Sequence, residues 1–170
     1  MIKNILLLLI VMPLLAGCSG GNKDLREKLQ TAVEADDAGT KGYKTIALAE
    51  LTDFDWDTAY FFQSPETARD ISDRIGYKWE GKDVPDWHNR LLFVKGGKVV
   101  SYMDYNYQEF PLRVFGCNTD QWAYPRSRSR FTSFKYCQNE EPVYTFIPEP
   151  CLGNIQELMA AKCPDAEAEK

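Results

Sequence analysis

Three aspartates at alternate positions, Asp53, Asp55 and Asp57, form a pattern that is typical of a chemical site. The spacing D-x-D-x-D opens the calcium-binding loop of an EF-hand, where carboxylate oxygens coordinate the ion. The rest of that loop is missing, because Thr58 stands where the turn glycine belongs and Ser64 stands where the bidentate glutamate belongs. In an extended strand the carboxylates would also spread along one face. We therefore expect no metal and no cofactor.

The sequence contains one histidine, His88, so any Ser–His–Asp or Cys–His arrangement must use it. It lies between Trp87 and Asn89, with Asp83 and Asp86 nearby in sequence. No G-x-S-x-G elbow accompanies it. A carboxylate pair of the glycosidase kind needs no histidine, but the sequence does not place two acids across a cleft. We expect no catalytic residue, and a hydrolase that uses carboxylates or His88 is the alternative.

Three arginines at alternate positions concentrate positive charge in an otherwise acidic chain. Arg126, Arg128 and Arg130 are bordered by Trp122 and Tyr124, and in an extended segment the three side chains would point the same way. Arginine binds carboxylates and phosphates through its planar fork, and arginine with aromatic residues is typical of interface hot spots. A solvated loop is the simpler interpretation. These five residues are the candidate binding patch.

The amino terminus carries the features of an export signal. Lys3 precedes the apolar run Ile5–Met12, which is too short for a transmembrane helix. Residues 15–18, Leu-Ala-Gly-Cys, then resemble the lipobox of bacterial lipoproteins. The resemblance implies cleavage before Cys18, a diacylglyceryl group on its sulfur and an acylated amino group; two or more buried chains give lasting membrane attachment. An ordinary secretory signal with Cys18 as a plain thiol is the alternative.

The same resemblance predicts where in the cell the protein is located. In Gram-negative lipoproteins an aspartate just after the lipidated cysteine favours the inner membrane, and here that position is Ser19. We expect a lipid-anchored protein of the bacterial cell envelope, in the outer membrane and facing the periplasm. The predicted organisation is a signal peptide at 1–17, a lipidated tether with a short surface helix at 18–42, one α+β domain at 43–163 and a charged tail at 164–170.

The charge of the mature chain limits its partners. Cleavage before Cys18 removes one charged residue, Lys3, so the net charge of −5 becomes −6. A mildly acidic chain has no general attraction for nucleic acid or for anionic lipid headgroups. The expected partners are the membrane, through the lipid anchor, and an envelope protein; the sequence does not identify a ligand.

Four cysteines remain besides Cys18, an even number in an oxidising compartment, which predicts two disulfides. Three pairings are open. We expect Cys117 with Cys137, because strands ending near these residues would pair antiparallel around a short loop, and Cys151 with Cys163. A zinc site is the alternative, but the four cysteines contain no C-x-x-C pair.

Periodicity predicts mostly strands, and in the second of them Phe54, Trp56, Tyr60 and Phe62 would share one face. Two glycines at 96–97 predict a tight hairpin. The predicted strands are 45–49, 53–62, 91–95, 98–103, 111–115, 131–136 and 143–147. The expected fold is α+β, a mostly antiparallel sheet with helices packed on one side.

Two helices are predicted clearly, and a third, shorter one ends near Lys162. Residues 24–35 carry a narrow apolar stripe, which is typical of a surface or stalk helix. The second helix has Ser64 as its N-cap, Pro65 at its first position and Gly76 as its stop.

Residues 45–103 resemble a group of small, uncharacterised bacterial lipoproteins. The likeness depends on Phe-Asp-Trp-Asp at 54–57, the helix that ends at Gly76, Trp79 and the hairpin Leu-Phe-Val-Lys-Gly-Gly-Lys-Val-Val at 92–100. Nothing in it is catalytic, so it implies a compartment and a fold. We expect a lipid-anchored envelope lipoprotein that acts as a non-enzymatic binding or interaction module, with an envelope hydrolase as the alternative.

Overall fold

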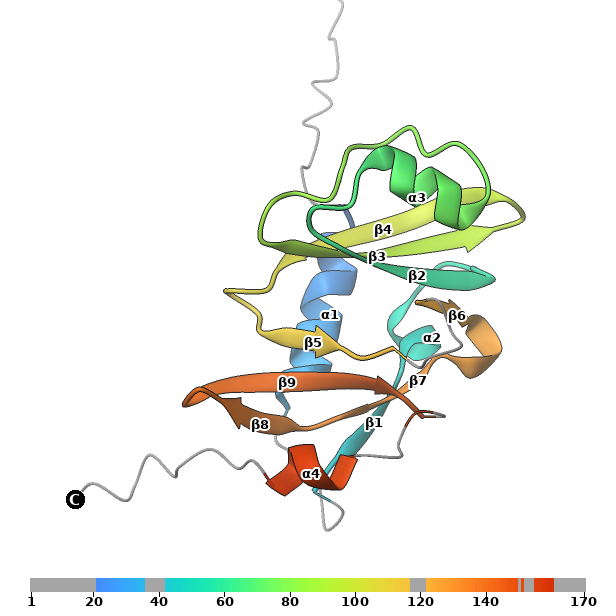
Figure 1. The fold of residues 1–170 in the computed structure, drawn as a ribbon. Coiled ribbons are helices and arrows are strands. Elements are labelled where there is room, and N and C mark those ends of the chain that lie inside the picture. Colours follow the sequence, from blue (N-terminus) through green and yellow to red (C-terminus); the bar gives the residue numbers. More distant parts are fainter. Residues whose placement is uncertain (1–20, 36–41, 117–121, 150, 152–154, 161–170) are drawn as a thin grey trace, which may run out of the picture.

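Two stacked β-sheets make up most of the structure (Figure 1). The computed structural model of the 170-residue chain describes residues 21–35, 42–116, 122–149, 151 and 155–160. The first sheet has the strand order β4-β3-β2-β6, with the bounds Lys98–Asn106, His88–Lys95, Thr58–Gln63 and Ala123–Pro125. The second has the order β1-β7-β9-β5, and β8 also pairs with β9; the bounds of these five strands are Lys44–Ala47, Arg130–Ser133, Glu141–Pro148, Leu112–Val114 and Lys135–Gln138.

Helices occupy a smaller share of the described residues. They are α1 (Lys23–Glu34), α2 (Leu48–Leu51), α3 (Ala68–Ile75), the 3-10 helix η2 (Arg126–Arg128) and α4 (Ile155–Ala160). Strand pairing in this part of the chain is antiparallel except between β5 and β9, which run parallel. The prediction of a mixed, mostly antiparallel fold is confirmed.

The main hydrophobic core lies between the sheets. Because side chains alternate along a strand, Phe61 and Phe93 point into this core, whereas their neighbours Phe62 and Leu92 belong to a second cluster on the outer face of the first sheet. Helix α3 covers that outer face, and α4 lies on the outer face of the second sheet (Figure 1). The expectation of one sheet with helices on one side is therefore wrong: there are two sheets, each apolar on both faces, and each has a helix on its outer face.

Helix α1 is part of the main core, contrary to the expected stalk. Its three apolar side chains, Leu25, Leu29 and Val33, are at most 2% exposed. Burying each of them contributes roughly 1.5–3 kcal/mol. The stripe is narrow because the helix touches the core along one line, where it runs from the first sheet toward the second (Figure 1).

Part of the expected tether is folded, because Gly21 and Asn22, the two residues before α1, lie on the edge of β4. Gly21 forms an antiparallel bridge with Met103, and the Asn22 backbone N–H donates to the Tyr102 carbonyl at 2.7 Å. The Asn22 side chain then accepts from the Leu25 N–H at 3.0 Å and caps α1. We call Gly21 and Asn22 the N-terminal strap.

The predicted strand at 53–62 is correct only in its second half, because β2 begins at Thr58. Phe54 and Trp56 therefore belong with the main core, whereas Tyr60 and Phe62 face the cluster under α3. The single shared face is wrong, since residues 53–57 turn before the strand begins and the alternation is interrupted there.

The glycine hairpin is confirmed in position and register. Val94 pairs with Val99 and Lys95 with Lys98, and both turn glycines have positive φ, 55° and 75°. Helix α3 ends at Gly76 as predicted, but its N-cap is Thr67, which forms a capping box with Asp70. The sequence Ser64-Pro65 suggested an earlier start, yet the Thr-x-x-Asp pattern defines the cap.

The strand geometry does not support the cysteine pairing as argued. Strand β5, which leads toward Cys117, pairs with β9 and not with β8, which contains Cys137. Cys117 and Cys163 lie outside the described residues. The two-disulfide expectation therefore stays a prediction, and so does the pairing of the four cysteines.

A buried ion pair joins β3 to β4. The Arg90 guanidinium donates to both carboxylate oxygens of Asp104 at 2.7 and 2.9 Å, and the two side chains are 2% and 4% exposed. Two of the three remaining guanidinium hydrogens bind the carbonyls of Lys82 and Asp83, at 2.7 and 3.2 Å. Each guanidinium nitrogen of Arg90 therefore has an acceptor, and the loop before β3 is fastened to the sheet.

Replacing Asp104→Asn leaves the Arg90 charge buried without its counter-charge. We expect a loss of about 3 kcal/mol or more in the free energy of unfolding, measured by urea denaturation. Asp73→Asn, which breaks an ion pair whose side chains are 89% and 74% exposed, serves as the control and should cost less than about 1 kcal/mol. Equal losses in the two variants would contradict this assignment.

Replacing Gly21→Ala tests the strap. Gly21 has φ 73°, and an added Cβ would overlap the Tyr102 carbonyl oxygen. Gly97→Ala is the matched control, because Gly97 has φ 75° with open space around it. We expect the control to cost about 1 kcal/mol for the left-handed backbone and Gly21→Ala to cost at least about 1 kcal/mol more. Thermal and urea unfolding of both variants measure the difference.

Candidate functional site

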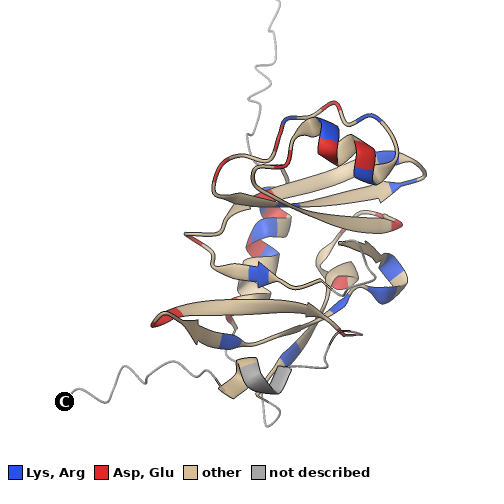
Figure 2. Cartoon of the chain, viewed as in Figure 1, with Lys and Arg blue, Asp and Glu red and all other residues tan. Residues whose placement is uncertain are grey.

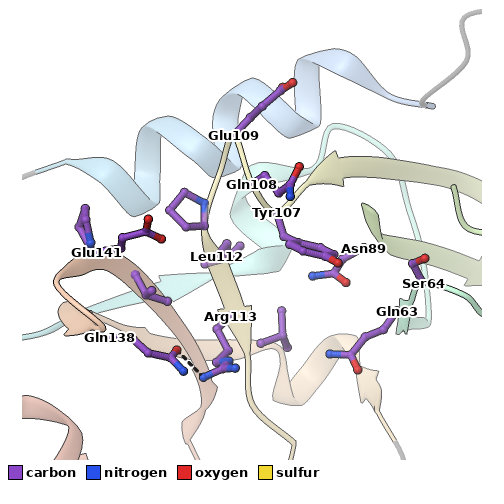
Figure 3. Close-up of a pocket in the computed structure, with 14 residues that line it drawn as sticks. Gln63, Ser64, Asn89, Tyr107, Gln108, Glu109, Leu112, Arg113, Gln138 and Glu141 are labelled. Carbon is purple, nitrogen blue, oxygen red and sulfur yellow. Dashed lines mark hydrogen bonds between the residues drawn. The ribbon is translucent and has the colours of Figure 1, made fainter. Parts of the chain in front are cut away.

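A groove of about 950 Å³ runs along β5, between this edge strand and the ends of β2 and β3 (Figure 3). We call it the β5 groove. One wall is the crossover from β4 to β5, which carries the chain from the first sheet to the second. Its polar lining side chains include Gln63, Asn89, Tyr107, Arg113 and Gln138.

Arg113 is the positive charge of this groove. It alternates with the buried Leu112 and Val114 on β5, so its exposed side chain points away from the main core. Its Nη1 donates to Gln138 Oε1 at 2.8 Å and to the Tyr136 hydroxyl at 3.3 Å, which are neutral acceptors. Among the described residues no carboxylate lies within ion-pair distance of it. A guanidinium with donors still available can bind a carboxylate through two parallel hydrogen bonds. Figure 2 shows a positive charge on β5; the other strands of the second sheet carry three further cations, Lys44, Arg130 and Lys135, and one acid, Glu141.

The floor is held by a buried hydrogen-bond chain from β3 to β5. Asn89 Nδ2 donates to the Tyr105 hydroxyl at 3.0 Å, and that hydroxyl donates to the Leu112 carbonyl at 3.0 Å. Burial raises the pKa of Tyr105 far above its usual range, although the hydrogen bond from Asn89 acts in the opposite direction. The phenol therefore stays protonated, and it fixes the start of β5.

The free side of β5 faces the groove. In a parallel pair, alternate residues bond to the partner strand; here the Tyr144 N–H donates to Pro111 and the Phe115 N–H donates to Phe146. The main-chain groups of Leu112 and Val114 consequently point away from β9. The Leu112 carbonyl accepts from Tyr105, and within the described residues the N–H and C=O of Val114 are left without a hydrogen-bond partner.

Aromatic side chains border one end of the groove. Tyr107 lines it, and its ring packs edge-on against Trp87 with 6.2 Å between centroids. These two are among the few large apolar side chains that are exposed in the described part of the chain, Trp87 at 57%. Glu109 and Glu141 also line the groove, but Glu109 projects away from the rest of the lining (Figure 3).

The predicted arginine patch lies on a turn and not on an extended segment. Residues 126–128 form the 3-10 turn η2, so the arginines do not alternate along an extended segment. Arg126 stacks on Trp56 at 5.2 Å, Arg130 pairs with Glu149 at 3.2 Å, and Arg128 is exposed. The two aromatic members face inward: Tyr124 is 2% exposed and packs on Phe131, and Trp122 packs on Phe61.

Two of the three aspartates, Asp55 and Asp57, fasten the glycine hairpin. Asp55 Oδ2 accepts from Lys95 Nζ at 2.8 Å, and Asp57 Oδ2 accepts from the Gly96 N–H at 2.8 Å. The hydrogen bond and the charge of Lys95 hold the pKa of Asp55 below its usual value. Within the described residues no three His, Cys, Asp or Glu side chains are grouped to hold a metal ion.

His88 stands at the start of β3 outside the groove lining. Its Nδ1 lies 2.7 Å from the Asp86 carbonyl oxygen, which is a backbone group and not a carboxylate. The residues that do meet at the groove, Gln63, Asn89 and Arg113, were missed from the sequence. The one available signal was Arg113, a charged residue between two apolar ones in a predicted strand.

No known protein family, curated protein or solved structure matches the chain. The resemblance to small lipoproteins therefore stays a prediction. None of the helices in the described ranges is long and apolar enough to cross a lipid bilayer.

Proposed function

We propose that this protein is a lipid-anchored interaction module of the bacterial cell envelope. In this proposal Cys18 carries the lipid, the anchor lies in the outer membrane, and the β5 groove binds an extended, acidic segment of an envelope protein. Two disulfides, as expected in that compartment, belong to the same proposal. The observation that carries the binding function is the free edge of β5 with Arg113 beside it.

An extended peptide fits this edge because a strand that adds to a sheet satisfies main-chain groups that are otherwise unpaired. Val114 offers one donor and one acceptor on that side. The new strand would lie between β5 and the residues at the ends of β2 and β3. Gln63 and Asn89 line that side of the groove, where amide groups bind both donors and acceptors.

The charge of Arg113 selects an acidic segment. Its guanidinium is already oriented by Gln138 and Tyr136, so little side-chain entropy is lost when a carboxylate binds. Arg113 is the single positive charge among the residues that line the groove, which also include Glu109 and Glu141, so the carboxylate of the segment is expected to bind at Arg113 itself. A hydrolase is not favoured, because His88 lies outside the groove lining and Glu109 projects away from it.

The anchor is tested by fractionating cells. We expect Cys18→Ala to move the protein out of the membrane fraction, because the acyl chains that hold it are lost. Ser19→Asp should keep the lipid and shift the protein to the inner membrane, and Ser19→Ala is the control that should leave it in the outer membrane. Mass spectrometry of the amino-terminal peptide identifies the lipid. A Cys18→Ala protein that stays with the membranes would overturn the anchor.

The groove is tested by photocrosslinking in intact cells that make the protein. A photoreactive amino acid in place of Gln63 should give one discrete adduct, and Arg113→Glu should reduce it about tenfold, since a charged hydrogen bond contributes about 1.5–3 kcal/mol. Arg69→Glu, on the exposed face of α3, is the matched charge reversal and should leave the adduct unchanged. An adduct that survives Arg113→Glu would contradict the proposed site.

A further inference from the structure

The N-terminal strap fixes how far the folded protein can stand from its anchor. Two residues, Ser19 and Gly20, separate Cys18 from Gly21 in the sequence. Three steps along a chain reach at most about 11 Å. Because Gly21 is bridged to Met103 in the middle of β4, the residue that carries the lipid, Cys18, lies within about 11 Å of the β4 edge.

The surface beside the strap is apolar and uncharged. A shallow depression of about 370 Å³ is lined by the strap itself and by Trp79, Val99, Val100 and Tyr102. Val100 is 44% exposed. It is the extra residue of a β-bulge, since Val99 pairs with Val94 and Ser101 with Phe93. None of the side chains that line this depression carries a charge.

The aromatic residues of this surface are held rigidly. The Arg90 guanidinium lies 4.9 Å from the Tyr102 ring centroid and 5.6 Å from that of Trp79. The two rings pack edge to face at 5.4 Å, and Trp79 Nε1 donates to the Lys82 carbonyl at 3.0 Å. Tryptophan and tyrosine with one apolar side and one polar group are the residues that favour the membrane–water interface.

We propose that this surface, formed by Trp79, Val99, Val100 and Tyr102, rests on the lipid bilayer. The inference depends on the proposed lipidation of Cys18, which supplies the short link. The first sheet then meets the membrane with its β4 edge, while β6, at the opposite edge of that sheet, faces away. The contact is apolar, so it is independent of anionic lipid and of salt.

The test uses the full lipidated protein reconstituted in phosphatidylcholine vesicles whose acyl chains carry a fluorescence quencher. One variant carries a dye on Val100→Cys. The matched control carries the same dye on Arg128→Cys, because Arg128 is exposed in η2, directly after β6. Labelling of the unmutated protein gives the background from its own cysteines.

We expect the dye at position 100 to be quenched about threefold or more relative to the dye at 128, because interfacial side chains reach into the acyl boundary. The ratio should persist when the salt is raised to about 0.5 M, since no charge takes part. Equal quenching at the two positions, in protein that sediments with the vesicles, overturns the docking surface and leaves the anchor standing. Protein that does not sediment with the vesicles overturns both proposals. A ratio that collapses in high salt overturns the apolar contact.

Discussion

The buried pair of Arg90 and Asp104 holds the first sheet, its loop and its outer aromatic residues together. A guanidinium with so little exposure is stable only if each of its donors has an acceptor, and here they are shared between a carboxylate on β4 and two carbonyls in the preceding loop. The planar guanidinium of Arg90 also packs against the aromatic rings of Trp79 and Tyr102. One residue therefore determines the position of an edge strand, a loop and a surface.

The two-sided character of the strands explains which parts of the fold could be predicted. The run Leu91 to Val94 is apolar without alternation, which is the pattern of a strand buried on both faces. The hairpin after it was predicted to the residue, because two consecutive glycines determine a turn locally. The stop of α3 at Gly76 is local in the same way. The uninterrupted apolar run at 91–94 also indicated that both faces of the sheet containing it are covered by other parts of the chain.

The parts that could not be predicted depend on contacts between distant segments. The apolar stripe of α1 correctly predicted which side of the helix is apolar. The burial of Leu29, however, depends on two sheets that form from residues far along the chain. The β5 groove exists because a three-residue strand pairs in parallel with β9, and such a pairing has no local signature. The expected alternation of the three arginines is absent for a local reason: residues 126–128 form a turn, and side chains alternate only in an extended segment.

The strap also sets an order of events in the life of the chain. On the proposed anchoring, the enzymes that attach the lipid and cut before Cys18 work in the membrane, on residues that lie next to Gly21 in the sequence. Once Gly21 is bridged to β4 and α1 is packed in the core, the cleavage position lies only three residues in sequence from a residue that is fixed on the sheet edge. Maturation is therefore expected to come first and closure of the fold second. Since β4 forms from residues near the middle of the chain, the amino terminus stays accessible until they have been exported.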